Sequence, residues 1–154
     1  MRTVTIEISA LETIRAETIR RPDGLETGGI LLGRVIKGAA HLHVTVAGDP
    51  GPQALHELQR FRRDLAHAQT LADHAWADHQ AVWVGEWHTH PLPIGPSTTD
   101  VHASGRLAVA GGHDIALLVL ALGTRGWSGH ALNADPTESI ETLKFSVEGT
   151  GNDG

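Results

Sequence analysis

The sequence predicts an α/β or α+β fold in which a mainly antiparallel mixed sheet is flanked by helices. Short apolar stretches with strand character recur along the chain, two segments carry a helical period, and the two kinds do not alternate strictly. The 154 residues are 40% hydrophobic and 19% charged, which suffices for one sizeable core. We therefore expect one domain over residues 1–148 and a flexible tail at residues 149–154.

The first third of the chain is expected to form a strand, a short helix and a hairpin. Residues 3–8 alternate between apolar and polar types, which is typical of a strand. Ser9 followed by Glu12 resembles a capping box that opens a helix, and RRPDG at residues 20–24 ends it. Residues 25–38, LETGGILLGRVIKG, then form an apolar strand, with residues 41–48 as its hairpin partner.

A long helix is expected next, because apolar residues recur every three or four positions from Leu55 to Asp78. Phe61 would lie in the core on the buried side of this helix. Three arginines would lie on its solvated face: Arg60, Arg62 and Arg63.

The second half is expected to supply strands around a further helix. Residues 81–87, AVWVGEW, form a strand, and Ser97 caps a helix that runs over residues 101–109. The apolar run at residues 115–122 is typical of a buried central strand. Residues 126–133 form one more strand, whereas residues 136–147 are ambiguous between helix and strand.

Composition excludes several classes of function. The formal net charge of −6 argues against nucleic acid as the main partner. Because the chain has no cysteine, it has no disulfide, no thiolate zinc site and no cysteine nucleophile. No apolar run is long enough to span a bilayer, and the N-terminus does not resemble a secretion signal. We expect a soluble cytoplasmic protein without a membrane partner.

The stretch HTHPLPIGPSTTD, residues 88–100, predicts a metal site. Side chains of a strand alternate between its two faces, so His88 and His90 share one face. Together with Asp100 they form a His2Asp set, which leaves one tetrahedral position open, as in catalytic zinc sites. His41 and His43 form a second such pair, but no SxxD motif lies nearby, and we do not expect them to bind a metal.

A catalytic zinc site needs further groups around the metal. Zinc lowers the pKa of its water to roughly 7, and a nearby carboxylate must then carry the proton to the leaving nitrogen. Glu86, on the same strand face as the histidines, and Glu26, at the mouth of a glycine-flanked strand, are equal candidates on sequence alone. Ser97 can cap its helix and also face the metal.

Several motifs in this order resemble the JAMM (MPN+) metallopeptidases, which remove ubiquitin-like proteins from their targets. They are Glu26 with TGGILLG, then GEWHTHP, then SxxD from Ser97 to Asp100. The resemblance covers roughly residues 3–120 and implies a cytidine-deaminase-like JAMM fold. It also implies that Glu26 is the general acid/base and that Ser97 stabilises the oxyanion. One Zn2+ per chain would be bound by His88, His90 and Asp100.

The chain looks most like the compact bacterial branch of that family, which occurs in antiphage systems such as CBASS beside E1- and E2-like proteins. The implied function is cleavage after the C-terminal tail of a ubiquitin-like modifier or a conjugated protein. Two alternatives stay open: C-terminal trimming of a small sulfur-carrier protein, and a non-catalytic MPN-type scaffold. The chain departs from the family in one place, since six residues separate His90 from Ser97 where the family usually has seven.

The chain is short and leaves little room for long insertions that grip a substrate, so we expect a simpler mode of substrate binding. A modifier tail would lie extended against a sheet edge by β-augmentation, with its scissile bond at the metal. Glycines would allow the backbone of the tail to come close: Gly28, Gly29, Gly111 and Gly112.

Overall fold

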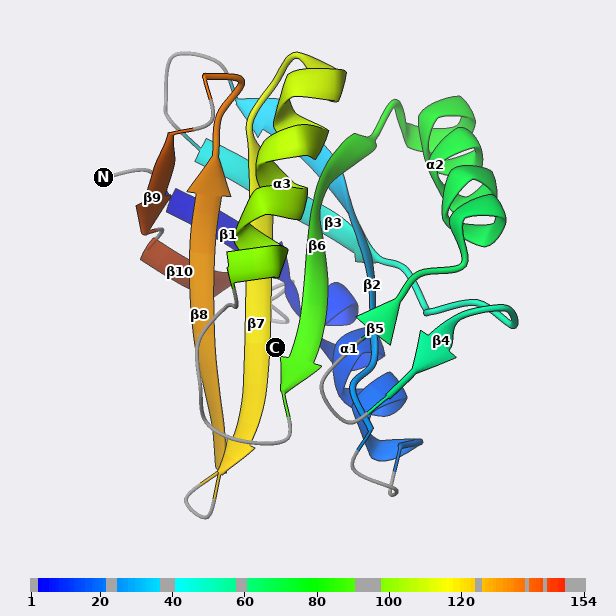
Figure 1. Cartoon of the computed structure of the whole chain (residues 1–154). Helices are drawn as coiled ribbons and strands as arrows, with labels where there is room; N and C mark the ends of the chain where they lie inside the picture. Colours follow the sequence, from blue (N-terminus) through cyan, green and yellow to red (C-terminus); the bar gives the residue numbers. More distant parts are fainter. Residues whose placement is uncertain are drawn as a thin grey trace, which may run out of the picture.

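The structure is a computed structural model that describes residues 3–21, 25–36, 41–57, 61–90, 98–123, 126–137, 139–142 and 144–148. These residues form three helices and ten strands (Figure 1). In chain order the elements are β1 (Thr3–Glu7), α1 (Ile8–Ile19), β2 (Gly28–Ile36), β3 (His41–Ala47), β4 (Leu55–His56), β5 (Phe61–Arg62), α2 (Leu65–His79), β6 (Val82–His90), α3 (Thr98–Gly111), β7 (Ile115–Gly123), β8 (Gly126–Ala134), β9 (Ile140–Thr142) and β10 (Lys144–Glu148).

Eight of these described strands form one curled sheet in the order β10-β1-β3-β2-β6-β7-β8-β9, and β4 pairs with β5 in a separate hairpin. Four of the seven pairings in the described sheet are antiparallel: β2 with β3, β2 with β6, β7 with β8, and β8 with β9. The predicted α+β class with a mainly antiparallel mixed sheet is therefore confirmed. Strand β7, the apolar run, lies inside the sheet between β6 and β8 as predicted.

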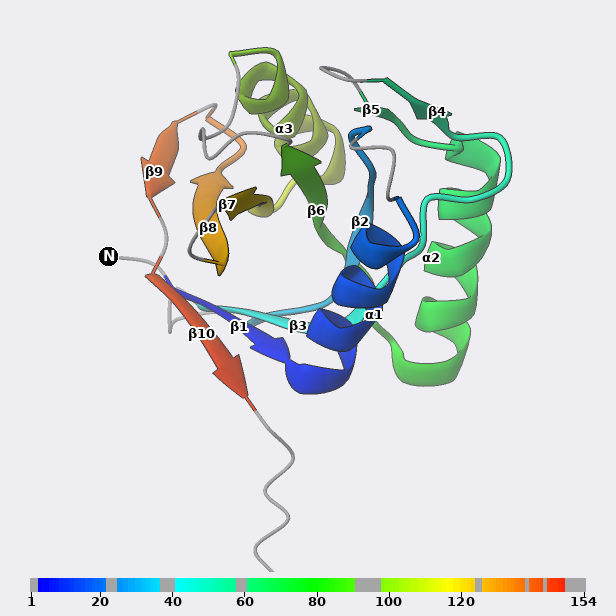
Figure 2. The same ribbon diagram turned by 90° about the horizontal axis from the view of Figure 1, so that it is seen from below.

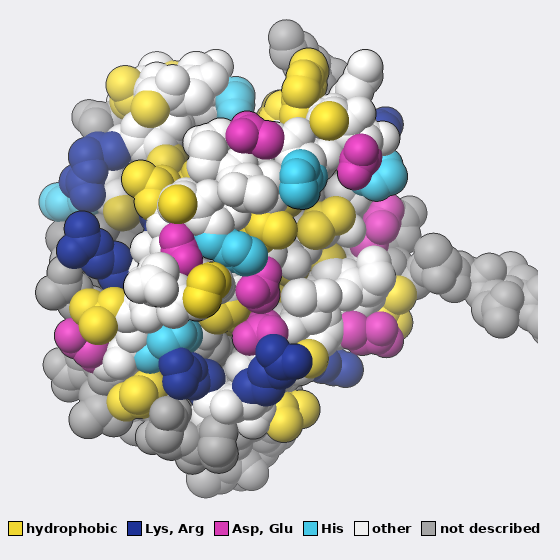
Figure 3. All heavy atoms as spheres, turned by 90° about the vertical axis from the view of Figure 1, so that its right-hand side faces the viewer, with side chains coloured by type: hydrophobic (Ala, Val, Ile, Leu, Met, Phe, Trp, Pro, Cys, Tyr) yellow, Lys and Arg dark blue, Asp and Glu magenta, His cyan; other side chains and the backbone are white. Residues whose placement is uncertain are grey.

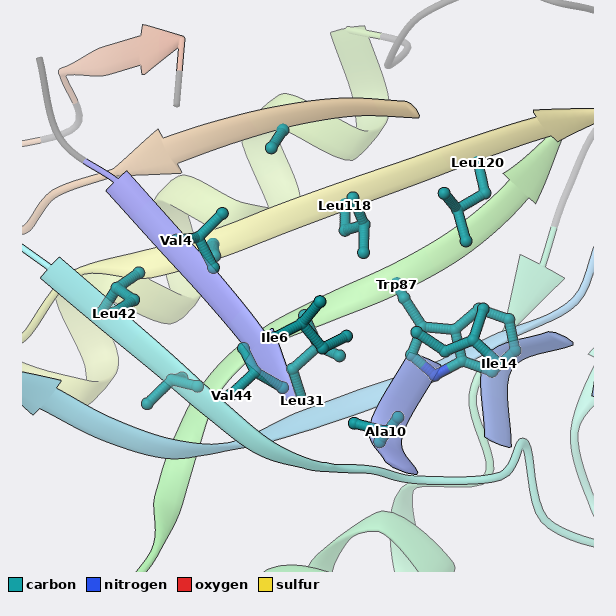
Figure 4. Packing of buried hydrophobic residues seen from close by; sticks show 14 residues of the cluster. Val4, Ile6, Ala10, Ile14, Leu31, Leu42, Val44, Trp87, Leu118 and Leu120 are labelled. Carbon is teal, nitrogen blue, oxygen red and sulfur yellow. The ribbon is translucent and has the colours of Figure 1, made fainter. Parts of the chain in front are cut away.

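Helices cover both faces of the sheet (Figure 2). We call the face that packs on α1 the inner face and the face that packs on α2 and α3 the outer face. The largest cluster of buried side chains joins α1 to the inner face, where Ile14, Leu31, Trp87 and Leu118 meet (Figure 4). On the outer face, alanines of α2 pack against Ile30 of β2, and α3 packs against β7 and β8.

The predicted long helix is wrong for the described residues before Leu65, whereas residues 58–60, Arg60 among them, lie outside the described residues. Leu55–His56 and Phe61–Arg62 form the β4–β5 hairpin, and α2 begins at Leu65. Asp64 stops the helix from extending backwards, because its backbone is extended and its carboxylate accepts a hydrogen bond from the His67 amide at 3.1 Å. The same carboxylate accepts from the Gln53 amide at 2.9 Å, which ties the start of α2 to the chain before the hairpin.

Two other details differ from expectation. Helix α1 begins at Ile8 directly after β1, and its N-cap, Glu7, makes no side-chain capping bond, so the capping box at Ser9 is wrong. The ambiguous stretch at residues 136–147 contributes β9 and β10, and β10 lies parallel to β1. Ser97, the loop before it and the tail at residues 149–154 lie outside the described residues.

The face that carries α2 and the β4–β5 hairpin mixes apolar, acidic, basic and histidine side chains (Figure 3). Leu65 and Trp76 of α2 are exposed. None of the described helices is long and apolar enough to cross a membrane.

Candidate metal centre

His88 and His90 lie at the end of β6, with β2 on one side and β7 on the other. Both side chains are largely buried, and they lie on the outer face, as strand alternation predicts. Trp87, between Glu86 and His88, points to the inner face, where it is fully buried and its indole N–H donates to the Gly48 carbonyl at 3.0 Å. This anchor holds the strand in register beneath the two histidines.

Asp100 reaches both histidines from the first turn of α3. Its Oδ1 lies 3.4 Å from Nδ1 of His88, and its Oδ2 lies 3.5 Å from Nε2 of His90. The SxxD spacing thus brings the carboxylate to the HxH pair, as expected. Ser97, the first residue of that motif, lies outside the described residues, as does the six-residue loop before it.

Glu26 approaches the same pair from the segment that precedes β2, with Oε1 at 3.9 Å from Nε2 of His90. Its backbone is held by the β4–β5 hairpin: the Glu26 amide donates to the Glu57 carbonyl at 2.8 Å, and His56 Nδ1 donates to the Glu26 carbonyl at 3.0 Å. Sequence reasoning missed this contribution because it assigned residues 55–62 to a helix.

The middle residue of HTH, Thr89, also places Glu26. The amide of Thr27 donates to Thr89 Oγ1 at 3.0 Å, and the amide of Thr89 donates to the Thr27 carbonyl at 2.9 Å. Both threonines are buried. The residue next to Glu26 is therefore fastened to the residue between the two histidines.

The protonation equilibria of the site are shifted by its burial and its charges. Burial raises the pKa of Glu26, and the charge of Asp100 raises it further, although His90 and His88 lower it. Burial would lower the pKa of His88, but contacts with Asp100 and Glu86 outweigh burial and raise that pKa to about 9. A carboxyl with a raised pKa is suited to accept and return a proton near neutral pH.

Glu86 lies on the other side of His88 from Asp100. Its carboxylate is 2% exposed, with Oε1 paired to the guanidinium of Arg63 and Oε2 at 3.6 Å from Nε2 of His88. The expected solvated helix position of Arg63 is wrong, since this arginine lies between β5 and α2 and faces a buried acid. Glu86 is thus engaged by two partners, whereas Glu26 faces His90.

Phe61 was expected in a helix core, but it lies in β5 with its ring 5.7 Å from that of His88, edge to face. Gly28 permits this contact, because a Cβ there would come within 2.8 Å of both rings. Gly28 and Gly29 pair with His88 and Trp87 of β6, whereas the pairing of β2 with β3 begins at Leu31. The role of these glycines in admitting a substrate backbone stays a prediction.

The donor set suits zinc. With metal–ligand distances of about 2.0–2.1 Å, neighbouring ligand atoms of a tetrahedral site are roughly 3.3 Å apart. Asp100 lies at close to that spacing from both histidines, 3.4 Å from His88 through Oδ1 and 3.5 Å from His90 through Oδ2. No group of three or more His, Asp or Glu side chains in the described part of the chain is arranged to hold a metal ion, so the fit to zinc is one of donor chemistry.

The second HxH pair lies elsewhere, on β3. His41 Nδ1 is 2.6 Å from Thr3 Oγ1, and His43 Nε2 is 3.5 Å from a carboxylate oxygen of Glu7. These residues serve as a natural control for experiments on His88 and His90.

Comparisons with known proteins support the resemblance. Residues 9–140 match the family of prokaryotic homologs of the JAB domain. The chain is 32% identical over 109 residues to the CD-NTase/cGAS isopeptidase of Vibrio cholerae serotype O1, an alignment that covers 68% of this chain and 66% of that protein, just under two thirds of its length. The solution structure of protein DSY2949 from Desulfitobacterium hafniense shares the fold, with a TM-score of 0.72 and 16% identity over 97% of this chain and 96% of that one. Since the family match covers most of the sequence, the chain belongs to the prokaryotic JAB family.

Proposed function

We propose that this protein is a zinc-dependent JAMM-type isopeptidase that cleaves after the C-terminal tail of a ubiquitin-like modifier or conjugated protein. One observation carries the proposal: Glu26, the HxH pair and Asp100, from three separate segments of the chain, converge on one place on the outer face of the sheet. A member of this family that served only as a scaffold would not need to keep these four side chains together.

The residues divide the chemical work between binding and proton transfer. His88, His90 and Asp100 would hold the metal, which acts as a Lewis acid and lowers the pKa of water to roughly 7. Glu26 takes the proton of the attacking water and passes it to the leaving amine nitrogen of the scissile bond. Ser97 is proposed to donate a hydrogen bond to the oxyanion that develops on the carbonyl.

The substrate class follows from the relative in Vibrio cholerae, which is named for its action as a CD-NTase/cGAS isopeptidase. We propose that the substrate of this protein is likewise a conjugate between a protein tail and a target amine, made by E1- and E2-like proteins. A fusion in which a CD-NTase tail precedes a reporter protein is therefore the first substrate to test. A fusion with a sulfur-carrier tail tests the trimming alternative.

Metal analysis combined with cleavage of these fusions tests the proposal. Glu26→Gln should keep about one zinc per chain and lose nearly all turnover, because removal of a general base or acid costs roughly 10²–10⁴-fold. His88→Ala should lose both zinc and turnover. His41→Ala, in the second HxH pair, is the matched control and should keep both.

Two results would reject this assignment. Full activity of Glu26→Gln would remove Glu26 from proton transfer, and loss of activity in Glu86→Gln with zinc fully retained would point to Glu86 instead. Wild-type protein that binds no zinc when supplied with it would reject the metal-dependent function as a whole.

A further inference from the structure

We infer that Arg63 is a positioning residue for the metal centre, acting through Glu86 on the ring of His88. The inference rests on the proposed function, since it concerns a proposed zinc ligand. Neither Arg63 nor Glu86 is needed as a ligand or as the proton carrier in that proposal. Their role is to fix the orientation of the His88 ring relative to Asp100.

Glu86 is the link between the two. It is almost fully buried, and a buried carboxylate is stable only when charged or hydrogen-bonding partners compensate for lost hydration. One oxygen is paired with Arg63, which leaves the other oxygen directed at Nε2 of His88, 3.6 Å away. Without Arg63 the carboxylate would have to take up a proton, turn towards water or bind the ring of His88 differently.

Arg63 is itself held in place. It precedes Asp64, whose capping bonds to the amides of His67 and Gln53 fix the start of α2. Its guanidinium carbon lies 5.5 Å from the ring centroid of Trp83, which gives the planar group a second surface to rest on. The backbone beside Arg63 is thus held by Asp64, and its guanidinium contacts the ring of Trp83 and the carboxylate of Glu86.

The ring of His88 has a charged neighbour at each of its two nitrogens and an aromatic neighbour. Nδ1 faces Asp100 at 3.4 Å, Nε2 faces Glu86 at 3.6 Å, and Phe61 packs against the ring with centroids 5.7 Å apart. A carboxylate behind a metal-binding histidine fixes the ring orientation and makes the imidazole a better ligand, and loss of such a partner typically weakens metal binding roughly 10- to 100-fold. Glu86 is such a carboxylate, and Arg63 in turn holds Glu86.

Zinc affinity, measured by competition with a chromophoric chelator, tests the inference without a substrate. Arg63→Gln should weaken zinc binding by roughly 10-fold or more. Arg62→Gln, the change at the exposed neighbour, should alter affinity by less than about twofold. Glu86→Gln should weaken binding at least as much as Arg63→Gln, and adding Arg63→Gln to Glu86→Gln should have little further effect, because both act along one path.

A second pair of measurements tests whether Arg63 and Glu86 only stabilise the fold. The double variant Arg63→Met with Glu86→Leu replaces the ion pair by apolar groups and should keep the melting temperature of the metal-free protein near that of wild type. Its zinc affinity should nevertheless fall as in Arg63→Gln. In long-range ¹H–¹⁵N spectra of metal-free protein, the ring signals of His88 should shift in Arg63→Gln and stay unchanged in Arg62→Gln.

Zinc affinity and His88 ring signals unchanged in Arg63→Gln, whatever its melting temperature, would overturn the inference while leaving the proposed function intact. If wild type itself binds no zinc, the proposed function fails. The ring signals then still decide whether Arg63 positions His88.

Discussion

Glu26 reaches the histidines because the backbone on both sides of it is held. The β4–β5 hairpin binds its amide and carbonyl, and Thr89 binds the amide and carbonyl of Thr27. The sequence alone left Glu26 and Glu86 as equal candidates for proton transfer. The family resemblance favours Glu26. The structure adds a contact between distant residues, the pairing of Glu86 with Arg63, which no local pattern signals.

Thr89→Val tests this residue-scale account. The change keeps the shape of the side chain but leaves the buried amide of Thr27 without its acceptor, which costs about 1–3 kcal/mol of folding free energy. Loss of this hydrogen bond loosens the segment that carries Glu26 and Thr27. If Glu26 then moves away from His90, kcat should fall while zinc content stays at the wild-type level. Steady-state kinetics and metal analysis on the same preparation provide the readout.

Thr70→Val is the matched control, since Thr70 is an exposed threonine on α2 whose hydroxyl donates to the Ala66 carbonyl. It should leave kcat unchanged. Wild-type kcat in Thr89→Val, at normal zinc content, would show that this hydrogen bond does not place Glu26.

At the scale of elements, the β4–β5 hairpin is the feature that the sequence misrepresents. The apolar residues of the hairpin continue the three- and four-residue spacing of α2, so the sequence pattern predicts a helix there as well. The capping bond of Asp64 and the contact between Phe61 and His88 favour the extended form instead. The other main elements were predictable because their apolar residues follow the strand or helix period over longer stretches.

The start of α2 predicts a dependence of stability on pH. Backbone amides of His67 and Gln53 donate to Asp64 and lower its pKa below the ordinary 3.8. A carboxyl with a lowered pKa stabilises the folded state above pH 3.8 and loses that contribution as pH falls through its lower folded value. Asp64→Asn should therefore lower the urea midpoint at neutral pH, and the difference from wild type should shrink below pH 3.8.

Asp78→Asn, near the other end of α2, is the control for the change of charge. It should shift the midpoint little at either pH. A loss in Asp64→Asn that is equally large in acid would mean that the ionised carboxylate is not what the cap requires.

At the scale of the whole molecule, the curled sheet explains how distant motifs form one site. β2 and β6 are neighbours, so the segment before β2 lies beside the end of β6, and α3 packs on the outer face of β7 with its first turn at the histidines. The sequence predicted the sheet class and the convergence of His88, His90 and Asp100. It could not predict β10 beside β1 or Arg63 beside Glu86, because such pairings depend on the completed fold.

A crystal structure of the protein grown with zinc, with anomalous data collected at the zinc edge, tests the central claim most directly. The account predicts one peak at about 2.0–2.2 Å from His88, His90 and Asp100, with the carboxylate of Glu26 facing the open coordination position. A peak bound by other residues, no peak at this place, or Glu26 turned away from the metal would contradict it.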